Sequence, residues 1–200
     1  MKKIENFDEV KKTSDEVVSF DSLPIGPQIC KILKVKDVVN KEYLQIEFDI
    51  ADGDYKGFFA DQKKNFNNED WPSQGTLYKS YKSTAYKFFA SFIIAIEKSN
   101  PKFEWVWDET KLEGQYFVAN FAEEEWLDDT TNEIKVNVKC REVRSIQALK
   151  EGEVKLLKKK ELSDSEKQKS QAGGTVKKSS ESEDKKSPSK KDDDDDDLPF

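Results

Sequence analysis

The order of its alternating and helical segments is what most constrains the fold of this chain. Residues 43–50 alternate strictly, with apolar residues on one side and polar or aromatic residues on the other. This period of two predicts a half-buried β-strand. Residues 28–39 are rich in β-branched residues, but their alternation slips near Leu33 and Lys34. We therefore expect a long first strand with a β-bulge at this point, paired with residues 43–50 as a hairpin.

The same patterns predict three further strands. Residues 55–60 are apolar and aromatic around Gly57, which predicts a third strand with a sharp bend. Residues 61–80 are polar and irregular and predict a loop. Residues 114–121 and 134–140 alternate and predict a fourth and a fifth strand. The predicted core-facing residues of the fifth strand are Ile134, Val136, Val138 and Cys140.

A helix is predicted between the third and fourth strands. It begins at Ser83 or Thr84 and ends near Lys98, just before Asn100 and Pro101. Its apolar residues fall three or four positions apart, which is typical of a helix with one buried face. The predicted buried face comprises Ala85, Phe88, Phe89, Phe92, Ile93 and Ile96.

Three strands, a helix and two strands is the element order of the OB-fold, a five-stranded Greek-key β-barrel with a helix between strands 3 and 4. We expect this fold over residues 23–150, preceded by an N-terminal arm at residues 1–22. An α+β sandwich is the alternative arrangement of the same elements. From about Glu151, apolar residues give way to Lys, Glu, Ser and Gly, so residues 151–191 are predicted to form a disordered linker.

An acidic tip follows this linker at residues 192–200, with the sequence DDDDDDLPF. Adjacent carboxylates repel one another and stay solvated, so the aspartate run predicts steering towards a basic partner. An aromatic ring beside a terminal carboxylate can fill an apolar pocket that has Arg or Lys at its rim. We predict that the tip binds proteins through Asp192, Asp193, Asp194, Asp195, Asp196, Asp197, Leu198, Pro199 and Phe200.

Charge and composition exclude several classes of site. Charged residues make up 38% of the chain and its net charge is −7, which opposes nucleic-acid binding unless cations gather on one face. Histidine is absent, and Cys30 and Cys140 stand alone, so neither a zinc site nor a dithiol redox motif is expected. The acidic turn Asp49, Asp52 and Asp54 lacks the distal Glu of a calcium loop. We expect no catalytic activity, no metal and no cofactor.

The sequence also bears on localisation. Its longest apolar run, residues 88–96, is too short to span a bilayer, and the N-terminal residues lack the apolar region of a signal peptide. We therefore expect a soluble cytoplasmic protein with no membrane partner.

Two parts of the chain resemble a known family. The tip resembles the C-terminal tip of bacterial single-stranded-DNA-binding proteins (SSBs), where several aspartates precede a final aliphatic residue, Pro and Phe. Residues 20–150 resemble SSB-like proteins from replication and recombination modules of phages and prophages of Gram-positive bacteria. The motifs that carry this second resemblance are Leu23-Pro24-x-Gly26, Lys41-Glu42-Tyr43-Leu44, Asp54-Tyr55-Lys56-Gly57 and Glu97-Lys98-Ser99-Asn100-Pro101.

This resemblance implies a domain that coats single-stranded DNA without sequence preference. It also implies a tip that recruits replication, recombination or repair proteins in the bacterial host cytoplasm. Such binding needs aromatic faces for base stacking and cations along the backbone, and residues 77–87 interleave three tyrosines with three lysines. We predict that DNA binds Tyr43, Tyr55, Lys56, Phe58, Trp71, Tyr78, Lys79, Tyr81, Lys82, Lys34, Lys36, Lys139 and Arg141.

Two other functions fit the same sequence. In the first, the acidic domain is a protein-interaction adaptor or decoy whose tip competes for host proteins that bind SSB tips. In the second, the domain is a strand-annealing recombination factor, since annealing proteins also coat single strands. Homo-oligomers are compatible with all three functions.

Overall fold

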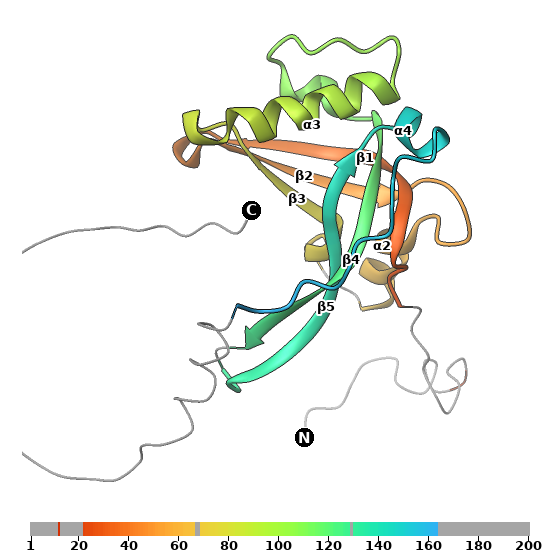
Figure 1. Ribbon diagram of the computed structural model, residues 1–200, viewed down its shortest axis with the longest axis vertical. Helices are drawn as coiled ribbons and strands as arrows, with labels where there is room; N and C mark the ends of the chain where they lie inside the picture. The colour runs from red at the N-terminus through yellow and green to blue at the C-terminus, as the bar shows by residue number, and fades with distance from the viewer. Residues whose placement is uncertain (1–11, 13–21, 67–68, 129, 164–200) are drawn as a thin grey trace, which may run out of the picture.

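The computed structural model describes residue 12 and residues 22–66, 69–128 and 130–163 (Figure 1). These residues form a five-stranded antiparallel sheet with a few helices. The strands follow the order β3-β2-β1-β4-β5 in the sheet. Their bounds are Gly26–Val38 for β1, Tyr43–Ile50 for β2, Thr76–Ser80 for β3, Tyr116–Asp128 for β4 and Glu133–Arg144 for β5.

Helices α2, α3 and α4 accompany the sheet. Helix α2 spans Phe58–Asn65, α3 spans Tyr86–Ser99 and α4 spans Ile146–Lys150. In Figure 1, α3 lies across one end of the sheet, and it contacts β3, β4 and β5. Short 3-10 turns complete the connections at Val39–Lys41, Ser73–Gly75, Ser83–Ala85 and Glu109–Leu112.

The predicted bulge in the first strand is confirmed. The register between β1 and β2 shifts between Ile32 and Lys34, so Leu33 is the additional residue. The strand predicted at residues 43–50 is confirmed as β2. The predicted helix between strands 3 and 4 is also present, as α3, although a 3-10 turn at Ser83–Ala85 precedes its first α-helical residue.

The third strand predicted at residues 55–60 is wrong, because this segment turns into α2. Gly57 has a φ of 80°, a left-handed conformation that favours glycine, and the helix starts at the next residue. The buried carboxylate of Asp49 accepts hydrogen bonds from the backbone N–H of Phe59 at 2.9 Å and of Ala60 at 3.1 Å. These are the N–H groups that a helix leaves unpaired at its start, so Asp49 stabilises α2 from the end of β2.

The true third strand lies within the segment predicted as a loop. Strand β3 pairs with β2 from Thr76 to Ser80. The 3-10 turn before it is tightly packed: a Cβ atom on Gly75 would lie 2.7 Å from Nε1 of Trp71 and 2.8 Å from the ring of Phe59. Only glycine fits under this indole, so Gly75 allows Trp71 to cover the start of β3.

The sheet is not closed into a barrel. Among the described residues, β3 and β5 remain its two edges, and no ladder joins them. The side chain of Gln74, just before β3, reaches across the gap: its Nε2 donates a hydrogen bond to the carbonyl of Val138 at 2.8 Å. The described residues therefore have five strands with a helix between the third and the fourth, as predicted, but they lack the last row of backbone hydrogen bonds that would close a barrel.

Aromatic side chains dominate the core on the inner face of the sheet. Phe48, Phe59, Phe117 and Phe121 are fully buried, and the rings of Phe48 and Phe117 meet edge to face at 5.3 Å. Helix α3 adds Phe89, Phe92, Ile93 and Ile96, as predicted, and Ala85 is buried just before it. The predicted burial of Phe88 is wrong. Its side chain is 67% exposed, because it lies about 100° around the helix from Phe89.

The β4–β5 hairpin extends beyond this core (Figure 1). Val138 and Cys140 pack against the core, as predicted, whereas Ile134 and Val136 are 42% and 49% exposed. Their predicted burial is wrong because the hairpin continues past the residues that could cover them.

The beginning of the predicted linker lies along this hairpin. The backbone N–H of Lys160 donates to the carbonyl of Glu123 at 2.9 Å, and the N–H of Glu125 donates to the carbonyl of Lys160 at 2.8 Å. The side chains of Lys159 and Lys160 form ion pairs with Glu125 and Glu124. We call residues 153–163 the strap. The rest of the linker, most of the N-terminal arm and the acidic tip lie outside the described residues.

Within the described part of the chain, no helix is both long enough and apolar enough to cross a membrane.

Candidate nucleic-acid interface

Three neighbouring strands present one continuous face on the side of the sheet opposite the core. In antiparallel pairs, directly opposed residues place their side chains on the same face. The pairing of β1 with β2 and of β2 with β3 therefore aligns three rows of side chains. We call this surface the outer sheet face; its rows are Lys34–Glu47–Thr76, Lys36–Gln45–Tyr78 and Val38–Tyr43–Ser80.

The bulge at Leu33 is what brings two lysines to this face. Before the bulge, Ile32 points into the core, and after it Val35 does so, so Lys34 and Lys36 point outward. Both lysines are exposed, and within the described part of the chain neither forms an ion pair. Two cations on adjacent outward positions suit the regular spacing of backbone phosphates.

Two tyrosines supply the aromatic part of the outer sheet face. The rings of Tyr43 and Tyr78 meet edge to face, with their centroids 5.6 Å apart. Tyr78 is 59% exposed, while Tyr43 is half-buried beside it. A flat ring with an open face is what stacking of an unpaired base requires.

The outer sheet face therefore collects four of the predicted DNA-binding residues, namely Lys34, Lys36, Tyr43 and Tyr78. Its one carboxylate is Glu47, opposite Lys34. The remaining members are the apolar Val38 and the neutral polar residues Gln45, Thr76 and Ser80, none of which was predicted. The alternation of residues 43–50 is the signal that could have identified Gln45, whereas residues 76–80 carry no comparable apolar alternation.

Two residues predicted for the site point the other way. Lys79 lies opposite Leu44 on the inner face, with its Nζ 5.6 Å from the centroid of the Phe92 ring. Burial lowers the pKa of Lys79. Tyr81 packs against the core beside Phe89, and its hydroxyl donates a hydrogen bond to Asp37 at 2.7 Å. That hydrogen bond raises the pKa of Tyr81 to about 12.

Two aromatic residues that were predicted to bind DNA pack against the core instead. The indole Nε1 of Trp71 donates to the carbonyls of Phe48 at 3.2 Å and of Gly75 at 3.0 Å, and its ring packs on the core. Phe58 begins α2 and packs edge to face on Phe59 at 5.3 Å. Neither side chain belongs to the outer sheet face.

The other predicted residues lie on turns or on β5. Tyr55 and Lys56 are exposed in the turn before α2, and Lys82 is half-exposed in the turn after β3. Lys139 forms an ion pair with Glu124 at 2.8 Å, and Nη1 of Arg141 donates to the carbonyl of Lys158 at 2.9 Å. The structure does not bring these five residues together with the four on the outer sheet face.

The carboxylates of Asp49 and Asp52, at the end of β2 and in the turn after it, also accept hydrogen bonds from the backbone. Besides the two N–H groups of α2, the carboxylate of Asp49 accepts from the N–H of Ile50 at 2.8 Å. Burial raises the pKa of Asp49, and the three backbone donors act in the opposite direction. Asp52 accepts from the N–H of Gly53 at 3.0 Å. The carboxylate of Asp49 is thus committed to holding the β2–α2 connection.

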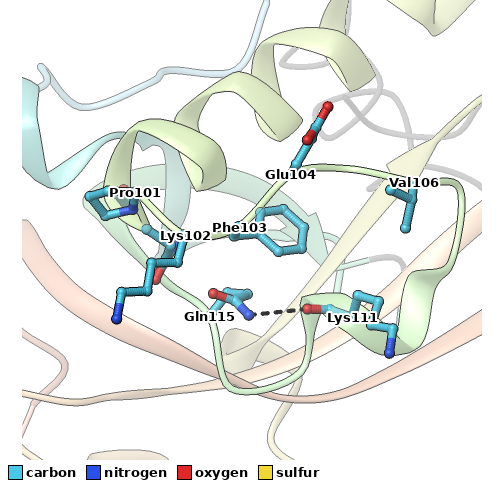
Figure 2. Close-up of a pocket in the computed structure, with 9 residues that line it drawn as sticks. Pro101, Lys102, Phe103, Glu104, Val106, Lys111 and Gln115 are labelled. Atoms are coloured by element: carbon cyan, nitrogen blue, oxygen red, sulfur yellow. Dashed lines mark hydrogen bonds between the residues drawn. The ribbon is translucent and has the colours of Figure 1, made fainter.

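A separate pocket of about 710 Å³ lies in the loop between α3 and β4 (Figure 2). Phe103 and Val106 form its apolar part, and Lys102, Lys111 and Glu104 are charged residues that line it. On the same loop, Trp107 is 78% exposed and stacks on Phe89, with centroids 6.3 Å apart. The pocket shares no residue with the outer sheet face.

Comparison with known proteins assigns no family to the chain. No protein-family model matches it, and no curated protein sequence matches it either. The geometry of the outer sheet face therefore carries the functional argument.

Proposed function

We propose that this protein binds single-stranded DNA without sequence preference, through the outer sheet face of an OB-type domain. The observation that carries the proposal is the placement of Lys34 and Lys36 beside the Tyr43–Tyr78 pair on one exposed surface. Cations contact phosphates and aromatic rings stack on bases of any sequence, so this pairing suits a coat protein. The resemblance to SSB-like phage proteins points to the same role, in protection of single strands during replication and recombination.

The OB-type assignment is part of this proposal. In that fold a helix between strands 3 and 4 covers one end of the barrel, and α3 has this position in the chain. Strands β3 and β5 would be neighbours in the closed barrel, and Gln74 already connects their two sides through Val138.

Titration of the full chain with a fluorescent oligo-dT across a salt series tests the function. We expect binding that weakens steeply as salt rises, because each phosphate contact releases counterions. An oligonucleotide of the same length and mixed sequence serves as the control, and it should bind with similar affinity. Absence of binding at low salt would disprove the proposal.

The second candidate is a protein-interaction adaptor, and the net charge of −7 favours it. An adaptor would show no binding to oligo-dT at any salt concentration, so the same titration separates the two functions.

The acidic tip completes the proposed function. Its aspartates and final Phe200 would recruit partner proteins, as the SSB-like sequence implies. Deletion of residues 192–200 should leave affinity for oligo-dT unchanged or higher at low salt, because an acidic tethered segment competes with DNA for cations. Weaker DNA binding after this deletion would contradict the division of roles between tip and domain.

A further inference from the structure

Within the described residues, the outer edge of β5 in the β4–β5 hairpin pairs with no other strand. The carbonyl of Val138 accepts from Gln74 and so points away from β4. Backbone groups alternate along a strand, so those of Ile134 and Val136 point to the same side. On β4, Glu123 and Glu125 use their outward groups to pair with the strap. Within the described residues β5 has no such second neighbour, because it pairs with β4 alone.

The side chains along this edge are apolar on one face. Ile134 and Val136 share the face of Val138, yet they are 42% and 49% exposed. Exposed edge strands usually carry free lysines that discourage pairing with another chain. Here Lys135 forms an ion pair with Asp128, and Lys139 forms one with Glu124, so both lysines are held against β4.

The sequence of this edge is complementary to itself in one antiparallel register. With Val136 opposite its own copy, Ile134 faces Val138 of the second chain, and Glu133 faces Lys139. Lys135 then faces Asn137. A register centred on Lys135 would instead oppose two lysines directly, which is destabilising. Charge and apolar pattern therefore select the register centred on Val136.

We propose that a second copy of this chain pairs with β5 along residues 133–139, antiparallel and symmetric about Val136. The contact is isologous, so it closes a dimer. It joins two three-residue apolar rows, each made of Ile134, Val136 and Val138, and supplies partners for the outward N–H and C=O groups of Ile134 and Val136. The outer sheet face takes no part in it, so each subunit keeps its own face.

Sedimentation equilibrium of the full chain tests the assembly. The chain has a mass of 23.1 kDa, and we expect the unmodified protein to sediment at about twice this mass. Val136→Lys should restore the monomer mass, because it places two ammonium groups opposite each other. Val106→Lys is the matched control, since Val106 is 60% exposed on the loop between α3 and β4. A monomeric unmodified protein, or a Val136→Lys variant that stays dimeric, would overturn the proposal.

Disulfide cross-linking tests the register without disturbing the strand. Opposed residues in a hydrogen-bonded antiparallel pair have Cα atoms about 5.5 Å apart, which lies within the range a disulfide spans. Mild oxidation should convert most of Val136→Cys to a covalent dimer on a non-reducing gel. Val106→Cys and the unmodified protein, with Cys30 and Cys140, measure the background. Cross-linking of Val136→Cys no faster than that background would reject this pairing.

Discussion

Tyr43 and Tyr78 meet edge to face across the β2–β3 ladder, with ring centroids 5.6 Å apart. Each ring limits the rotamers of the other, so the pair presents an ordered aromatic surface before any ligand binds. Preordered side chains lose less entropy on binding.

Replacement of this pair should weaken binding to single strands. We expect Tyr43→Ala and Tyr78→Ala each to lower the affinity for oligo-dT by about 1–3 kcal/mol, the value of one stacked base. Fluorescence anisotropy at fixed salt measures the change. Tyr86→Ala is the matched control, because Tyr86 on α3 is also 59% exposed. Equal losses of affinity for Tyr78→Ala and Tyr86→Ala would show that the outer sheet face is not the DNA-binding site.

The two outward lysines should determine part of the salt dependence. Lys34→Ala and Lys36→Ala should each reduce the slope of log affinity against log salt by about 0.7, the value for one phosphate contact on a single strand. Repeated oligo-dT titrations at several salt concentrations give this slope. Lys98→Ala, at the exposed end of α3, should leave it unchanged. An unaltered slope in both β1 variants would mean that neither lysine contacts a phosphate.

Protonation of Asp128 should loosen the β4–β5 hairpin in acid. The hydrogen bond from Lys135 and those from the N–H groups of Thr130 and Thr131 lower the pKa of Asp128 from 3.8 to about 2. The folded state therefore favours the carboxylate, and its stabilising effect is complete above pH 3.8 and is lost as the pH falls through about 2. NMR titration of the carboxyl carbon measures the pKa, and Lys135→Gln should raise it. A pKa near 3.8 in the unmodified protein would contradict the contact.

The strap should stabilise the folded domain. A chain that ends at residue 152 loses the two backbone hydrogen bonds between Lys160 and β4, which together contribute about 1–3 kcal/mol. It also loses the ion pairs that join two exposed lysines to the partly buried side chains of Glu124 and Glu125. Urea unfolding should therefore show a lower midpoint for residues 1–152 than for residues 1–163. Residues 1–163 and the full chain should unfold alike; equal midpoints for all three would show that the strap contributes nothing.

Strong local patterns predicted much of this fold. The alternation of residues 43–50 identified β2, and the slip near Leu33 in residues 28–39 identified the bulge, because one face of each strand is buried. The spacing of apolar residues identified α3 for the same reason. Segments whose state depends on a distant residue were not predicted. Helix α2 begins at Phe58 because Asp49, ten residues before Phe59, accepts its first free N–H groups.

Strand β3 and the outer sheet face also depend on distant residues, and they were not predicted for the same reason. The inward row of β3 contains Lys79, whose ammonium group lies over the Phe92 ring, so the strand lacks a clean apolar side. The sequence shows that tyrosines and lysines are interleaved in residues 77–87, but it does not show on which face of the strand each side chain lies. Tyr78 points outward while Lys79 and Tyr81 point inward, and only the register with β2 distinguishes them.

The bulge at Leu33 divides β1 into two segments with different neighbours. Residues 26–31 pair with β4, whereas residues 34–38 pair with β2 alone. On its other side this second segment has a hydrogen bond from the N–H of Val35 to the carboxylate of Glu113. Segments with fewer cross-strand bonds open at lower free-energy cost than the core they adjoin. The half of β1 that carries Lys34 and Lys36 can therefore bend to follow an irregular, flexible polymer, while the half that supports the phenylalanine core keeps its shape.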